Sequence, residues 1–85
     1  MAELIQTYAE ALRDAQGVEY TVHAYGEARA DGNWEGWLEF HSAAGDVRRT
    51  ERETTQPNQE ALRYWASGLE PVYLDGAFAR VLKEV

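Results

Sequence analysis

The chain has no cysteine, only two prolines and one lysine (Lys83), and these shortages narrow the classes of protein it can belong to. Without cysteine it has no disulfide, iron–sulfur centre, thiol chemistry or cysteine-bound zinc. Basic residues are also scarce, because fifteen acidic residues stand against eight basic ones and the net charge is −7. Such a charge repels nucleic-acid backbones and anionic lipid surfaces, so we expect neither nucleic acid nor membrane as a partner.

Long apolar runs are missing as well. No stretch of about 18 apolar residues exists for a membrane span, and the opening Met1-Ala2-Glu3 lacks the cationic start of a secretory signal. We therefore expect a cytoplasmic protein. The 85 residues, 45% of them hydrophobic and 27% charged, match an ordinary globular composition and have the length of one domain, residues 1–85.

The first segment places apolar residues at three- and four-residue intervals, which predicts an amphipathic helix that ends at Gly17. Its apolar positions are Leu4, Ile5, Tyr8, Ala11, Leu12 and Ala15.

The middle of the chain alternates apolar and polar residues, which predicts strands over residues 18–29 and 34–41 and a charged edge strand over 47–54. After Pro57 a helix carrying Leu62 and Trp65 is predicted, with a left-handed cap at Gly68. A last helix is expected from about Asp75, with Val72–Leu74 left open as a fourth short strand. The predicted fold is α+β: an N-terminal helix, a three-stranded antiparallel meander, and two C-terminal helical segments packed on one sheet face.

The register of the strands is predicted from the requirement that directly opposite residues share a face. A three-residue turn over 31–33, with Asn33 left-handed, pairs Ala24 with Phe40 and gives one wholly apolar face. A four-residue second turn ending at Gly45 pairs Phe40 with Val47 and Glu39 with Arg48. Small residues on the apolar face leave room for bulky helix side chains; they are Ala24, Gly26, Ala28 and Gly36.

The other sheet face is expected to expose aromatic side chains among charged ones, a composition typical of interfaces. It predicts a binding surface for a protein partner or a second copy of the chain, built from Tyr25, Trp37, Glu39, His23, His41 and Arg48. The alternative is that Trp37 only fastens the sheet by packing on its neighbours.

Catalytic and metal sites are not supported by the residue pattern. His23, His41 and Glu39 offer two imidazoles and one carboxylate, but no spacing specifies the further ligand that a metal needs. Glu27 and Glu39 lie on an open face without a pocket to shift a pKa. We therefore assign no catalytic residue, metal ligand or cofactor and favour a non-enzymatic function.

A second candidate site is the junction between the third strand and the following helix. Guanidinium, hydroxyl and phenol groups there are typical of anion or small-molecule binding, within an enzyme or outside one. The residues of this alternative site are Arg52, Thr54, Thr55 and Tyr73.

Three segments, Gly32–Phe40, Thr50–Asn58 and Tyr64–Leu74, resemble a family of small uncharacterised bacterial proteins. The resemblance covers most of the chain and implies a bacterial origin, but it implies no activity. The predicted element order is also similar to the double-stranded-RNA-binding domain. That domain begins its second helix with lysines for phosphate, whereas this helix begins Pro57-Asn58-Gln59-Glu60.

Overall fold

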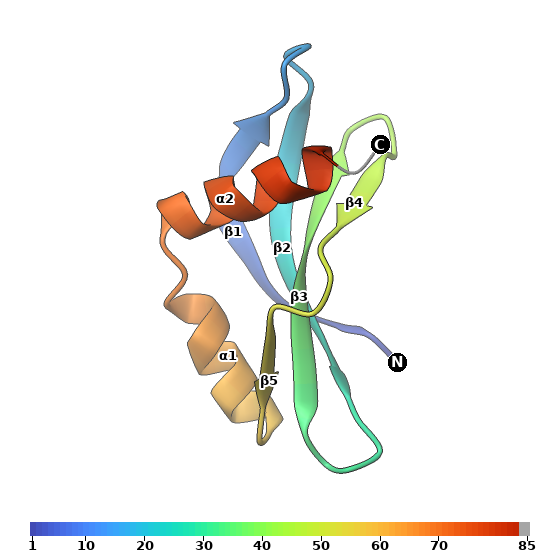
Figure 1. Cartoon of the computed structure of the whole chain (residues 1–85), viewed down its shortest axis with the longest axis vertical. Helices are drawn as coiled ribbons and strands as arrows, with labels where there is room; N and C mark the ends of the chain where they lie inside the picture. The colour runs from blue at the N-terminus through green and yellow to red at the C-terminus, as the bar shows by residue number, and fades with distance from the viewer. Residues whose placement is uncertain (84–85) are drawn as a thin grey trace.

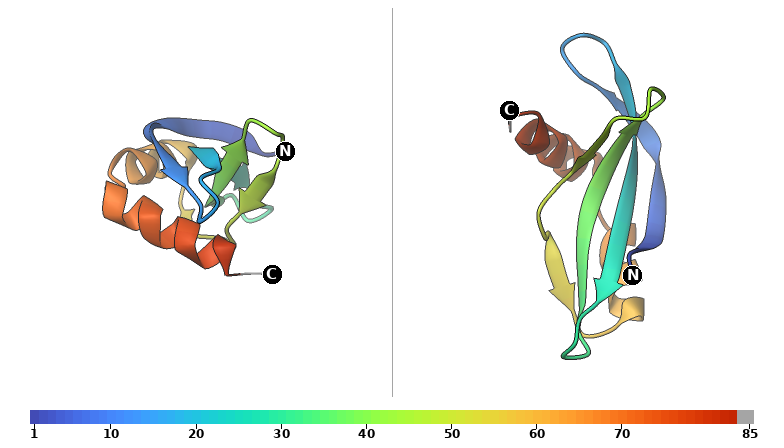
Figure 2. Two further views of the ribbon diagram at one scale, coloured as in Figure 1. Left: turned by 90° about the horizontal axis from the view of Figure 1, so that it is seen from above. Right: turned by 90° about the vertical axis from the view of Figure 1, so that its right-hand side faces the viewer.

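An antiparallel sheet and two C-terminal helices make up the computed structural model, which describes residues 1–83 (Figure 1). The strands run in the order β1-β2-β3-β4, and β5 pairs with β3 beyond the end of β4. Both helices pack on the same face of the sheet, the inner face (Figure 2). The elements are β1 (Glu3–Arg13), β2 (Glu19–Ala28), β3 (Trp34–Ser42), β4 (Val47–Arg49), β5 (Thr54–Gln56), α1 (Gln59–Ser67) and α2 (Pro71–Leu82).

The structure confirms the predicted α+β class, with an antiparallel sheet and two C-terminal helices. The predicted N-terminal helix is wrong, and so is the predicted count of three strands. Because the chain begins with a strand, the similarity in element order to the RNA-binding domain disappears. Neither helix within residues 1–83 is long and apolar enough to cross a membrane.

All three hairpins use the same kind of turn, in which three residues connect the strands and the last is a glycine. Gly17, Gly32 and Gly45 have φ values of 82°, 90° and 95°. Each donates its N–H to the carbonyl three residues earlier, at 3.0–3.1 Å. Positive φ costs glycine little, and a three-residue loop ending in this conformation fits the twist of antiparallel strands.

The N-terminal segment is a strand because two bulges give it a helix-like spacing of apolar residues. Between Leu4 and Gln6, and again between Thr7 and Ala11, β1 advances further than its partner β2. These bulges convert the two-residue period of a strand into steps of three and four. Ile5, Tyr8 and Leu12 thereby all pack into the core, as they would on one side of a helix.

The first turn of the predicted meander has the expected length but lies one residue earlier. The loop is 30–32, closed by a hydrogen bond from the N–H of Arg29 to the carbonyl of Asn33, and Gly32 rather than Asn33 is left-handed. Ala24 therefore faces Leu38 instead of Phe40. A shift of two in the register leaves every side chain on its predicted face, so the division into an apolar and a polar face stands.

The second turn has three residues, 43–45, instead of four. A hydrogen bond from the N–H of Ser42 to the carbonyl of Asp46 closes it, and Phe40 pairs with Arg48, not with Val47. A shift of one residue in the register moves every side chain of β4 to the opposite face of the sheet. Arg48 consequently lies on the inner face, near Tyr20, and the prediction that it belongs to the outer surface is wrong.

The expected edge strand over 47–54 is divided into β4 and β5. The intervening residues stay attached to β3 through the N–H groups of Thr50 and Glu53, which donate to the carbonyls of Leu38 and Gly36. Thr50 also accepts the N–H of Leu38 on its hydroxyl. The chain bulges outward between these anchors, which leaves Glu51 and Arg52 exposed.

The helices form largely as expected, with different ends. Asn58 caps α1 by accepting the N–H of Ala61, and Gly68 follows its end with φ −95°, so the predicted left-handed cap is wrong. Pro71 begins α2, where its fixed φ suits the first turn. Val72–Leu74 therefore belongs to a helix and does not form a fourth strand.

Glycines in the centre of the sheet let α1 approach closely, as the small residues of the apolar face predict. A Cβ atom on Gly26 or Gly36 would overlap the side chain of Leu62. Leu62 is fully buried there, in a core that also contains Phe40 and Phe78, with ring centroids 5.0 Å apart.

Gly36→Ala should destabilise the fold by about 1–3 kcal/mol, because the added methyl has no room. Its Cβ would lie 2.6 Å from Leu62 Cδ1 and 3.2 Å from Thr54 Cγ2. Gly76→Ala, in α2, is the matched control because a Cβ there meets nothing within 4 Å. It should stabilise the helix by about 0.5–1 kcal/mol. Urea denaturation measures both, and equal stability of the two variants would contradict this view of the α1 contact.

Candidate functional site

The outer face of the sheet, opposite the helices, brings most of the expected surface residues together. It is formed by alternate residues of β2 and β3 together with Thr7 of β1 and Arg49 of β4, which pair with them. In Figure 2 both helices lie on the other side of the sheet. Its central residues are Thr21, His23, Tyr25, Trp37, Glu39, His41 and Arg49; of the six predicted residues, only Arg48 lies elsewhere.

Trp37 lies on this face but is 1% exposed, so the expectation of an exposed tryptophan is wrong. The guanidinium of Arg49 covers it, with Cζ 3.9 Å from the ring centroid. Its indole N–H donates to Glu39 Oε2 at 2.9 Å. A cation stacked on the ring and a satisfied N–H make Trp37 a fastener of the sheet, which was the alternative interpretation.

Glu39 organises the centre of the outer face. While Oε2 accepts from Trp37, Oε1 accepts from His41 Nε2 at 2.9 Å, and the side chain is only 15% exposed. His41 in turn stacks with Tyr25, with ring centroids 6.1 Å apart and planes 20° from parallel. The three rings and the carboxylate therefore support one another in a single orientation.

His23 lies beside His41, with ring centroids 4.7 Å apart, and both of its nitrogens are engaged. Thr21 contacts Nε2 at 2.9 Å and Thr7 contacts Nδ1 at 3.1 Å. The single hydroxyl proton of Thr21 is donated to the carbonyl of His41. We therefore assign the Nε2–H tautomer to His23, donating to Thr21 and accepting from Thr7 on Nδ1.

This environment favours the neutral form of His23. Burial, and then the neighbouring His41, lower its pKa from 6.5, and Glu39 opposes them without reversing the direction. No group of three or more His, Asp or Glu side chains within residues 1–83 is placed to hold a metal ion. His23 and His41 are held by threonines and a carboxylate, so the pair is arranged for packing and hydrogen bonding.

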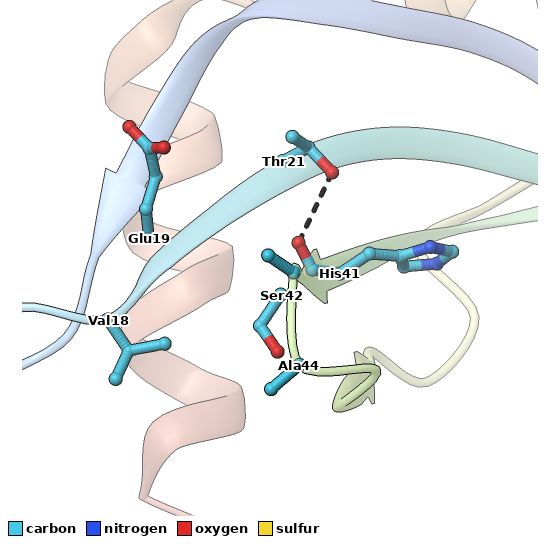
Figure 3. Close-up of a pocket in the computed structure, with 7 residues that line it drawn as sticks. Val18, Glu19, Thr21, His41, Ser42 and Ala44 are labelled. Atoms are coloured by element: carbon cyan, nitrogen blue, oxygen red, sulfur yellow. Dashed lines mark hydrogen bonds between the residues drawn. The ribbon is translucent and has the colours of Figure 1, made fainter.

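A hollow of about 410 Å³ lies between the start of β2 and the third hairpin turn (Figure 3). Val18, which follows the first turn, and Ala44 of the third turn line it, with Glu19 and Thr21 from β2, while the imidazole of His41 points away from it. Sequence reasoning missed this feature, because it treated Gly17 as the end of a helix and so placed no hairpin there.

The alternative anion site is not assembled as expected. The hydroxyl of Tyr73 donates to Glu53, and Thr54 accepts from the amide of Gln56 at 2.7 Å. Arg52 and Thr55 are exposed. The phenol of the predicted site therefore binds the chain's own carboxylate, Glu53.

Glu53 is the centre of a well-formed ion pair that the sequence analysis did not identify. Its side chain is 6% exposed and receives two hydrogen bonds from Arg80, at 2.8 and 3.0 Å, in the fork geometry of a guanidinium. Burial opposes its charge, but the hydrogen bonds from Arg80 and Tyr73 outweigh burial and lower the pKa of Glu53. Burial and the bond to Glu53 raise the pKa of Tyr73 to about 12.

Comparison of the chain with protein-family models, with curated proteins and with solved structures found no match. The resemblance to a bacterial family therefore stays a prediction, and the functional argument rests on the outer face itself.

Stability should fall as the pH is lowered from about 8 to 5, in part because of His23. Its folded-state pKa lies below 6.5, so the unfolded chain takes up the proton first and gains stability relative to the fold. His23→Gln keeps a hydrogen-bonding side chain but does not titrate, so its loss of stability over this range should be smaller. Urea denaturation at several pH values gives the slope. An unchanged slope in the variant would show that His23 does not contribute.

Glu53→Gln should lower the free energy of unfolding by about 1–2 kcal/mol at neutral pH, because Arg80 loses a charged acceptor. Since the pKa of Glu53 is lowered from 4.5, its contribution is present above 4.5 and is lost at more acidic pH. Glu51→Gln, exposed in the same connection, is the control and should change little. If the two variants unfold at the same urea concentration, the Glu53 cluster does not stabilise the fold.

Proposed function

We propose that this chain is a protein-binding module that uses the outer face of its sheet. The observation that carries the proposal is the asymmetry of the sheet. Two helices bury the inner face, while within residues 1–83 the outer face carries interlocked, half-buried polar and aromatic side chains with no helix over them. Side chains already fixed in place lose little conformational freedom on binding, and aromatic rings supply contact area.

The net charge of the chain favours a basic partner. Four glutamates lie on the outer face, and three of them form ion pairs: Glu19 with Arg13, Glu35 with Arg29, and Glu27 with the N-terminal amine. The whole chain carries a net charge of −7, which adds a long-range attraction for positively charged proteins. A second copy of the chain fits less well, since two chains of net charge −7 repel each other.

The hollow beside the third turn supplies an apolar contact at one end of this face. Val18 is 40% exposed beside it, and Val47, which pairs with His41 on the outer face, is 56% exposed. An aliphatic side chain or stem of the partner would pack there, next to Glu19. A basic residue with a long aliphatic stem can pack its stem in the hollow and place its charge near Glu19.

Substitutions that leave the buried Trp37 intact provide the test, because removing that ring would leave a cavity. The face variant combines Tyr25→Ala with Glu27→Lys and Glu35→Lys. All three residues are half-buried.

A control variant makes the same change in charge on the helical side, with Glu70→Lys and Asp75→Lys. Both of those residues are exposed. Proteins captured by the wild-type chain from a lysate of its host are purified, and calorimetry then measures Kd with each variant.

The face variant should raise Kd by at least about tenfold, and the control variant by less than about twofold. Added salt should also weaken the wild-type complex, because opposite charges attract across the interface. Equal binding by the face variant would contradict the proposal. So would a wild-type chain that sediments as a dimer and becomes a monomer in the face variant, since the occupant would then be a second copy.

A further inference from the structure

Arg49 occupies an unusual position at the centre of the outer face. It is exposed, yet its guanidinium is held over the indole of Trp37, with 3.9 Å between Cζ and the ring centroid. The cation lies against the face of the indole, and the rest of the guanidinium stays open to solvent because the side chain is exposed. The group is thus preorganised before any ligand arrives.

The carboxylate nearest in register accepts hydrogen bonds from two other residues. Glu39 pairs with Arg49 across β3 and β4, but its two oxygens accept from His41 and from Trp37, each at 2.9 Å. Among residues 1–83, Arg49 forms no ion pair. Arg80 differs from Arg49 in this respect, because its guanidinium donates two hydrogen bonds to Glu53.

We infer that Arg49, stacked on Trp37 beside Glu39, is a binding position for one carboxylate group of the protein partner. This inference rests on the proposed function and specifies what the partner presents at the centre of the face. A planar carboxylate matches two parallel N–H groups of a guanidinium. Phosphate fits less well, because its second negative charge would lie near Glu39.

The partner is then a basic surface with a single acidic residue among its positive charges. The net negative charge of the chain attracts the partner's basic groups, and Arg49 meets the acidic one. A pattern of this kind discriminates against surfaces that are uniformly basic, because they would place a cation against Arg49. Long-range charge brings the partner near, and Arg49 sets its orientation.

The test uses small ligands, so it does not depend on identifying the partner. Isotope-labelled protein is titrated with N-acetyl-glutamate methylamide, with its neutral glutamine analogue, and with inorganic phosphate, at constant ionic strength. The indole N–H signal of Trp37 reports on Arg49 above it. Variants Arg49→Ala and Arg49→Lys are compared with Arg52→Ala, an exposed arginine three residues away.

The glutamate ligand should shift the Trp37 signal in a saturable way, and the glutamine ligand should not. Arg49→Ala should abolish saturation. Arg49→Lys should weaken binding at least about threefold, since lysine lacks the planar fork. Arg52→Ala should leave the affinity within about twofold of wild type.

Three results would overturn the inference: no saturable shift with the glutamate ligand, tighter binding of phosphate than of the glutamate ligand, or an equal loss in Arg52→Ala. If any of these is found while the face variant still loses its partner, the inference fails and the proposed function stands. If Arg49 binds the glutamate ligand but the face variant keeps its partner, the proposed function fails instead.

Discussion

The three hairpin turns that end in glycine are the constraint on which the rest of the structure depends. Each turn needs a residue with positive φ at its third position, and Gly17, Gly32 and Gly45 meet this need at low conformational cost. Once these positions are set, the hydrogen bond that closes each turn fixes which residues pair across the strands. Register in turn decides which side chains face the helices and which stay on the outer face.

The position of Gly45 shows how much one turn decides. With three residues in that turn, Arg49 faces Trp37 and Glu39, while Arg48 lies against Tyr20 on the inner face. A turn of four residues would exchange the two arginines. The outer face would then keep a cation, but the one available for stacking on Trp37 would change, and so would the group exposed to a partner.

Sequence reasoning predicted the two central strands and the first C-terminal helix, because their apolar residues follow simple periods of two or of three and four. It failed for β1, where bulges place Ile5, Tyr8 and Leu12 on one face at a helical spacing. A local signal was nevertheless present. The segments Asp14–Gly17, Arg29–Gly32 and Ser42–Gly45 all have alanine second and glycine fourth, and all three form the same turn. Burial of Trp37 could not be predicted in this way, because it depends on the guanidinium of Arg49 from another strand.

The contacts that stabilise the outer face also determine what it leaves available for binding. Glu39 takes part in both: it accepts hydrogen bonds from Trp37 and from His41, while Arg49 beside it forms no ion pair among residues 1–83. Covering Trp37 then requires a side chain with a flat, weakly hydrated cation, and arginine suits this role better than lysine. A stable packing of tryptophan on this open sheet therefore carries with it an exposed, oriented guanidinium, so the fold and the candidate interface arise from the same three side chains.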